Sequence, residues 1–81
     1  MTIRIQFFSR LREIGGSAVL EREVAPGTTV GAALAELERD LPKLADWQGK
    51  LLLAVGVEFA PHDQILQAND LLSVMPPVQG G

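Results

Sequence analysis

The side chains of this sequence offer little for acid–base or nucleophilic catalysis. His62 is the one histidine, and its neighbour Asp63 could orient it as a general base. No nucleophile or second metal ligand accompanies the pair, so we interpret His62 as an exposed loop residue. The chain contains no cysteine, which excludes a disulfide scaffold, a thiolate metal site, an iron–sulfur cluster and a catalytic thiol.

The charged residues and the internal glycines give no stronger signal. Two carboxylate pairs fall on faces that we expect to point outward, and we interpret them as solvating charges: Glu21 with Glu23, and Glu36 with Asp40. Gly15-Gly16 lacks the lysine and the spacing of a phosphate-binding loop. Arg10 and Arg12 could contact an acidic partner, although arginines that follow a strand are more often simple surface residues.

The most unusual chemical group is the carboxylate at the end of the sequence. The chain ends in Gly80-Gly81, behind Pro76-Pro77. Glycine has no Cβ, so such an end can enter a channel too narrow for any other residue. Its carboxylate becomes reactive when joined to AMP as an acyl adenylate, which a sulfur or nitrogen nucleophile can attack. The diproline would reduce the freedom lost on insertion. The alternative is a frayed end or linker remnant without function.

Composition limits the classes of protein to which the chain can belong. Its 81 residues suffice for one small domain. The net charge of −3 argues against nucleic-acid binding, which usually needs a basic stripe. With 47% hydrophobic and 21% charged residues the chain is globular, and part of its apolar surface could face a partner. The most apolar stretch, Leu51–Val57, is far shorter than the roughly 20 residues of a membrane-spanning helix. We find no secretory signal and expect a cytoplasmic location.

The N-terminal third predicts two strands with a short helical turn between them. Alternating residues predict a first strand, of which the core-facing members are Ile3, Ile5 and Phe7. The same alternation puts Phe8 on the solvent side. Ser9–Ile14 predicts one helical turn ended by glycine, and Ala18–Val24 predicts an edge strand whose charges discourage unwanted pairing.

The middle of the chain predicts one amphipathic helix. Ala25-Pro26-Gly27 is a turn signal, and Thr28 or Thr29 can cap the helix that follows it. The apolar stripe of this helix consists of Val30, Ala33, Leu34, Leu37 and Leu41. Pro42 is expected to end the helix at one of the two residues before it.

The last part of the chain predicts shorter elements. These are a polar connection (Lys43–Lys50), a strand buried on both faces (Leu51–Val55), its continuation or a hairpin arm (Val57–Phe59), and a segment that is mostly loop (Pro61–Asp70). Leu71–Met75 predicts the final strand. Its residues Leu72 and Val74 share one face, and Ser73 and Met75 share the wetter face.

Together these elements predict an α+β fold. A small mixed sheet with one main helix packed on one face is the architecture of the ubiquitin-like β-grasp roll. Residues 1–75 are expected to form the domain. Residues 76–81, which begin with two prolines and end with Gly-Gly, are expected to form a mobile C-terminal tail.

Four motifs carry a resemblance to a known family. They are Phe7-Phe8 at the end of the first strand, Arg12-Glu13 before Gly15, Pro26-Gly27-Thr28 before the helix, and above all Pro76-Pro77-Val78-Gln79-Gly80-Gly81. With them the chain resembles, over its full length, the small subunit of molybdopterin synthase. That family comprises β-grasp sulfur carriers of molybdenum cofactor biosynthesis.

This resemblance implies a reaction sequence centred on Gly81. An activating enzyme related to ubiquitin-activating enzymes would use ATP and Mg²⁺ to adenylate the Gly81 carboxylate, and sulfur would convert it into a thiocarboxylate. The tail residues Pro76, Pro77, Val78, Gln79 and Gly80 would enter the large synthase subunit, with Gly80 as the steric gate. There the sulfur would attack cyclic pyranopterin monophosphate. The family's complex is a heterotetramer, and the chain itself would bind no cofactor, metal, nucleic acid or membrane.

A tail of this kind needs a docking surface beside it. Phe8 and Met75 are predicted to point outward, and Met75 directly precedes the tail. We therefore expect the two side chains to form an apolar patch that both partners use. The alternative is that one or both of them belong to the core.

Three other functions stay open at this point. The sulfur carrier of the thiamine pathway has the same fold and tail chemistry, although its chains are usually shorter and lack the diproline. A protein modifier would join its terminal glycine to lysines of other proteins. In an interaction domain, the tail would have no function of its own.

Overall fold

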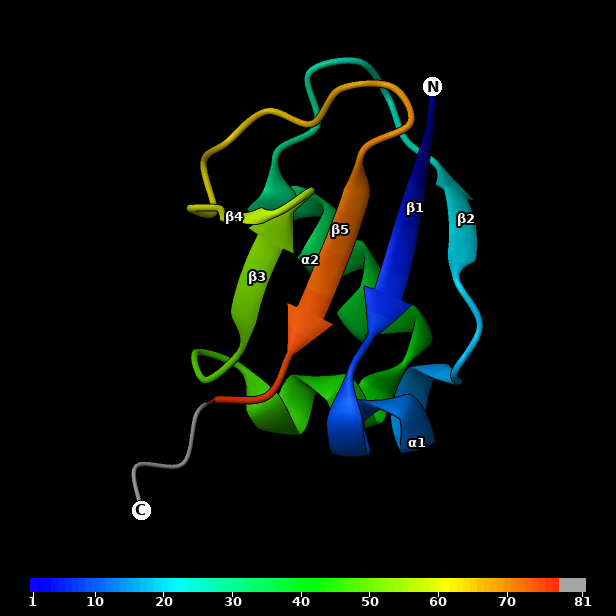
Figure 1. Cartoon of the computed structure of the whole chain (residues 1–81), viewed down its shortest axis with the longest axis vertical. Helices are drawn as coiled ribbons and strands as arrows, with labels where there is room; N and C mark the ends of the chain where they lie inside the picture. Colours follow the sequence, from blue (N-terminus) through cyan, green and yellow to red (C-terminus); the bar gives the residue numbers. More distant parts are fainter. Residues whose placement is uncertain (78–81) are drawn as a thin grey trace.

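The computed structural model describes residues 1–77, and within them five strands form one mixed sheet (Figure 1). The strands are β1 (Thr2–Phe7), β2 (Leu20–Glu23), β3 (Leu52–Val55), β4 (Glu58–Phe59) and β5 (Leu71–Met75). Their order across the sheet is β2-β1-β5-β3-β4. The central pair, β1 and β5, is parallel, and each of the other neighbouring pairs is antiparallel.

One main helix, α2 (Val30–Asp40), packs across one face of this sheet and leaves the other face open (Figure 1). The smaller helical segments are η1 (Ser9–Leu11), α1 (Arg12–Gly15) and η2 (Pro42–Trp47). A mixed sheet with a single principal helix on one face confirms the expected α+β, β-grasp architecture.

The alternation in β1 decides which side chains enter the core. Its alternate residues Ile3, Ile5 and Phe7 are all fully buried. The N–H of Phe8 donates to the carbonyl of Val74 at 3.1 Å, which continues the ladder by one residue. Since successive side chains of a strand point to opposite faces, Phe8 lies on the open face, as predicted.

Helix α2 begins and ends where its sequence signals place it. The Thr29 hydroxyl accepts a hydrogen bond from the backbone N–H of Ala32 at 3.1 Å, so Thr29 is the N-cap. The helix ends at Asp40, two residues before Pro42. Four members of the predicted stripe are buried, Val30, Ala33, Leu34 and Leu37, while Leu41 is half-buried at the end of the helix.

The short helix α1 is built around a close contact with the core. A Cβ on Gly15 would collide with the ring of Phe7, so only glycine fits against this fully buried phenylalanine. The next residue, Gly16, has φ +86° and ends the helix in a conformation that side chains disfavour. The two glycines therefore have different roles, one in packing and one in the turn.

Three sequence predictions need correction. The segment predicted as a polar connection, Lys43–Lys50, contains most of η2, whose Leu44 is fully buried. Strand β2 starts at Leu20 rather than Ala18, because its pairing with β1 stops at the pair of Leu20 with Ile5. Strand β3 is not buried along its whole length on both faces, since both of its ends are half-buried.

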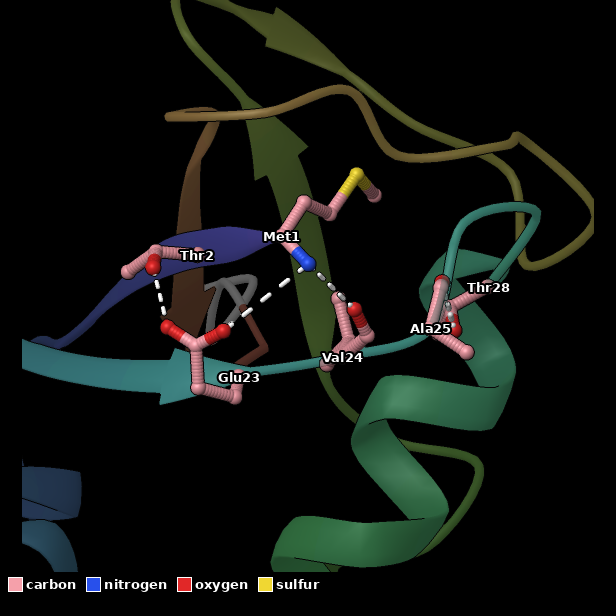
Figure 2. Close-up of polar contacts among 6 residues, drawn as sticks. All are labelled: Met1, Thr2, Glu23, Val24, Ala25 and Thr28. Atoms are coloured by element: carbon pink, nitrogen blue, oxygen red, sulfur yellow. Dashed lines mark hydrogen bonds and ion pairs between the residues drawn. The ribbon is translucent and has the colours of Figure 1, made fainter.

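The N-terminus is tied to the edge strand β2 (Figure 2). The Met1 ammonium donates to the carbonyl of Val24 at 2.9 Å and lies 3.8 Å from a carboxylate oxygen of Glu23. The Thr2 hydroxyl donates to the other oxygen of Glu23. These contacts hold β2 against β1 at the Glu23 end of their short ladder.

Candidate functional site

The predicted chemistry belongs to the segment that follows β5. Met75 ends this strand, and Pro76 and Pro77 after it are half-buried against the domain. The residues with the predicted chemical roles, Val78, Gln79, Gly80 and Gly81, lie outside the described residues. Their roles as tail and sulfur-carrying carboxylate stay predictions, and the described structure defines the surface around the point where they begin.

The open face of the sheet carries a hollow of about 260 Å³ that brings the two predicted docking residues together. We call it the sheet hollow. It is lined by Phe8, Ala54, Gly56, Val57, Phe59, Ser73 and Met75. Phe8 and Met75 are both half-buried. The expectation that they lie on the same face is met, while their contact with a partner stays a prediction.

The strand register explains why this face is hollowed. Ser73 of β5 pairs with Ala54 of β3, and Ala54 pairs in turn with Phe59 of β4. Two small side chains thus form the floor, with larger apolar side chains around them. A concave floor of small side chains with larger apolar walls favours an inserted apolar side chain of another molecule.

The hairpin between β3 and β4 extends this surface in a way that the sequence did not indicate as functional. Val57 is 99% exposed and Phe59 is 74% exposed. Gly56, with φ +64°, makes the turn that presents them. The available signal was two apolar residues flanking Glu58 directly after a glycine turn, a pattern that equally fits a buried strand.

A second hollow of about 240 Å³ lies where the chain leaves the sheet. We call it the root hollow. It is lined by Ser9, Arg10, Trp47, Pro76 and Pro77. These residues come from three parts of the chain, η1, η2 and the segment after β5, which all lie at the same end of the sheet (Figure 1).

The other chemical candidates have structural surroundings. His62 is exposed, and its backbone carbonyl accepts the N–H of Gly31 at 2.8 Å, so the loop holds the first turn of α2. Asp40, interpreted from the sequence as a solvating charge, forms an ion pair with Arg22 at 2.5 Å. Among residues 1–77 no three potential ligands gather into a metal site. The helices of the described chain are all too short or too polar to cross a membrane.

Comparisons with known proteins bear on the whole chain. The model of the ThiS family matches residues 5–81. The molybdopterin synthase sulfur carrier subunit of Haemophilus influenzae is 35% identical, over 98% of this chain and 99% of the relative.

Two solved structures share the fold. SAMP1 of Haloferax volcanii, a small archaeal modifier protein, has a TM-score of 0.86 at 27% identity, over 100% of both chains. A chain in the complex of subunits 1 and 2 of the molybdopterin-converting factor from Helicobacter pylori has a TM-score of 0.71 at 20% identity, over 100% of both chains.

Proposed function

Because this chain belongs to the ThiS family, we propose that it is the sulfur carrier subunit of a molybdopterin synthase. The observation that carries the proposal is the full-length similarity to such a subunit at 35% identity. The sequence adds a chemical argument. With no cysteine in the chain, a reactive sulfur can be held only at the terminal carboxylate, that of Gly81.

Sulfur loading proceeds in two steps on Gly81. The carboxylate attacks the α-phosphorus of ATP and releases pyrophosphate, which gives an acyl adenylate. A hydrosulfide equivalent then attacks the acyl carbon and displaces AMP, so that one carboxylate oxygen is replaced by sulfur. ATP and Mg²⁺ belong to the activating enzyme, and this chain holds no cofactor or catalytic side chain of its own. Both steps are assigned to the cytoplasm.

Sulfur transfer takes place in the large synthase subunit. The tail from Pro76 to Gly80 enters that subunit, and the thiocarboxylate sulfur attacks a carbon of cyclic pyranopterin monophosphate and displaces an oxygen substituent from it. Water then cleaves the acyl–sulfur bond, which leaves the sulfur on the pterin and returns Gly81 as a carboxylate. Two such transfers supply the two sulfurs of the dithiolene. The solved complex of subunits 1 and 2 from Helicobacter pylori supports a partner of this kind. In this chain the sheet hollow, with Phe8 and Met75 beside the tail, is the docking surface that we assign to both partners.

Intact mass spectrometry of the carrier tests the proposal. The chain is incubated with its activating enzyme, ATP, Mg²⁺ and a sulfide source, and its mass is expected to rise by the difference between sulfur and oxygen. A variant that lacks Gly81 is the matched control, because it keeps a glycine carboxylate but shortens the reach by one residue. The control is expected to stay unmodified. Wild-type chain that never gains sulfur under these conditions contradicts the proposal.

A second function is favoured by one specific finding. The similarity to the small archaeal modifier protein, at 27% identity over the full length, fits a protein that is attached to other proteins. The same adenylate would then be attacked by a lysine amine, with AMP leaving and an amide bond forming. Lysine adducts of this chain in lysates of its own cells, lost when Gly81 is deleted, would establish this activity.

A further inference from the structure

The root hollow surrounds the point where the tail leaves the domain, and its charge is unusual for this molecule. Of its described lining residues, Arg10 alone is charged, and no Asp or Glu is among them. The whole chain carries a net charge of −3. The hollow is therefore a positive spot on an acidic protein, placed beside Pro76 and Pro77.

Arg10 differs from Arg12 and Arg22, whose side chains already have partners in the described structure. Arg22 forms the 2.5 Å ion pair with Asp40. The Arg12 Nε–H donates to the carbonyl of Phe7 at 3.4 Å. Among residues 1–77, Arg10 makes no side-chain hydrogen bond or ion pair, and it is exposed. An unpaired guanidinium in a concave site is a strong donor for a carboxylate, which it can bind through two parallel hydrogen bonds.

The backbone before Arg10 is strained. Ser9 has φ +53°, in the left-handed region that non-glycine residues rarely adopt. This turn separates Phe8, which lines the sheet hollow, from Arg10, which lines the root hollow. Strain of this kind persists where surrounding structure holds it, and it often accompanies binding sites. Here the turn at Ser9 allows Phe8 and Arg10, two positions apart, to line two different hollows.

The length of the tail fixes what must approach the root hollow. Four residues follow Pro77, and a fully extended chain spans at most about 3.6 Å per residue, or about 14 Å in all. A protein that encloses Gly81 must therefore bring the mouth of its channel close to Pro77. A channel mouth close to Pro77 is also close to Arg10 and Trp47, which line the same hollow as Pro77.

We propose that Arg10 binds a carboxylate at the mouth of the channel in the large synthase subunit. The inference rests on the proposed function and adds a contact that positions the tail. Trp47 and the two prolines line the same hollow and would flank this contact with apolar surface. Charge complementarity selects an acidic side chain as the occupant, since the spot is positive and the rest of the carrier is acidic.

Affinity for the purified large subunit tests the contact. Arg10→Glu is compared with Arg39→Glu, which makes the same charge change at an exposed residue of α2 that lines neither hollow. Arg10→Glu is expected to weaken Kd about 10-fold or more and to reduce its dependence on salt, whereas Arg39→Glu changes Kd less than about twofold. Arg10→Lys should retain part of the affinity. Equal effects of the two glutamate variants overturn the proposal.

A local signal makes the test independent of affinity. Trp47 is the only tryptophan, so carrier labelled with 5-fluorotryptophan gives one ¹⁹F resonance from the root hollow. Adding unlabelled large subunit is expected to shift this resonance, and an unchanged resonance in the complex overturns the proposal even if Arg10→Glu binds weakly. Failure of the proposed function is distinguishable, because wild-type carrier would then neither gain sulfur on Gly81 nor bind the large subunit.

Discussion

Phe7 and Phe8 are adjacent in sequence but lie on opposite faces of the sheet, so truncating each of them separates stability from binding. Phe7 is fully buried and packs against Gly15. Phe8 is half-buried and lines the sheet hollow with Met75. We expect Phe8→Ala to weaken partner binding and to have little effect on folding. Phe7→Ala is expected to do the reverse.

The magnitudes follow from burial. Full burial of a phenylalanine side chain is worth about 1.5–3 kcal/mol, so half-buried Phe8 contributes about 1 kcal/mol to folding. Burial of the rest of the ring in the complex adds a similar free energy to binding. Because the hollow also closes around the ring, Phe8→Ala should lose about 1–2 kcal/mol of binding free energy. Since 1.4 kcal/mol is tenfold in affinity, Phe8→Ala should raise Kd about 5- to 30-fold. Truncation of a buried phenylalanine such as Phe7 costs about 3–5 kcal/mol.

The assay combines urea unfolding with calorimetric titration against the large subunit. The total stability of an 81-residue domain is about 4–12 kcal/mol. Phe7→Ala should remove a large part of this stability. If the alanine variant does not fold, Phe7→Leu is used as the control instead. Phe8→Ala should lower the free energy of unfolding measured in urea by only about 1 kcal/mol.

Two results would refute this reasoning. If Phe8→Ala lowers the free energy of unfolding as much as Phe7→Ala does, Phe8 belongs to the core. If Phe8→Ala is stable and binds the large subunit with unchanged Kd, the sheet hollow is not the docking surface.

Three further predictions concern the elements that position these surfaces. Gly15→Ala should destabilise the fold by about 2–4 kcal/mol despite the higher helix propensity of alanine, because its Cβ meets the Phe7 ring; an unchanged urea midpoint would show that the ring can move aside. Thr29→Ala should cost about 1 kcal/mol by removing the N-cap of α2, and Thr29→Asn, which keeps a capping oxygen, should recover most of the lost midpoint. Asp40→Asn breaks the ion pair with Arg22 at the surface. It should lower the free energy of unfolding by less than about 1 kcal/mol, and this difference should shrink in high salt; a large loss of stability that persists in high salt would contradict a surface ion pair.

Local periodicity explains which elements the sequence predicts well. The alternation of Ile3, Ile5 and Phe7 fixes the inner face of β1, and all three are fully buried. The three- and four-residue spacing of the helix stripe fixes the inner face of α2 in the same way. In both elements the period of the apolar residues matches the period of the backbone, so the buried face follows from a few neighbouring residues.

The element η2 shows where such reasoning fails. Leu41, Leu44 and Trp47 recur every third residue, the period of a 3-10 helix, and all three pack on the core. A search for strands and α-helices does not weigh that period, and the polar residues between them suggested a connection. The prediction therefore assigned Trp47 no structural role, although it packs against the core and lines the root hollow.

The two hollows depend on contacts that no local pattern contains. The sheet hollow needs the register that places Ser73 beside Ala54, and the root hollow joins Arg10, Trp47 and Pro76 from distant parts of the chain. Sequence parity did place Phe8 and Met75 on one face. It could not show the depression between them, because that depends on the size of side chains from other strands.

The parallel pairing of β1 with β5 also affects how the protein is made. A ribosome synthesises β1 first and β5 after nearly all of the other residues, yet Arg4 pairs with Leu71 at the centre of the sheet. The core therefore closes only after synthesis reaches the strand that leads into the glycine end. A product that stops before residue 71 lacks β5, so β1 is left without its parallel neighbour in the sheet and we expect the product to be open to proteases. We therefore expect truncated products to be degraded rather than to accumulate as folded protein.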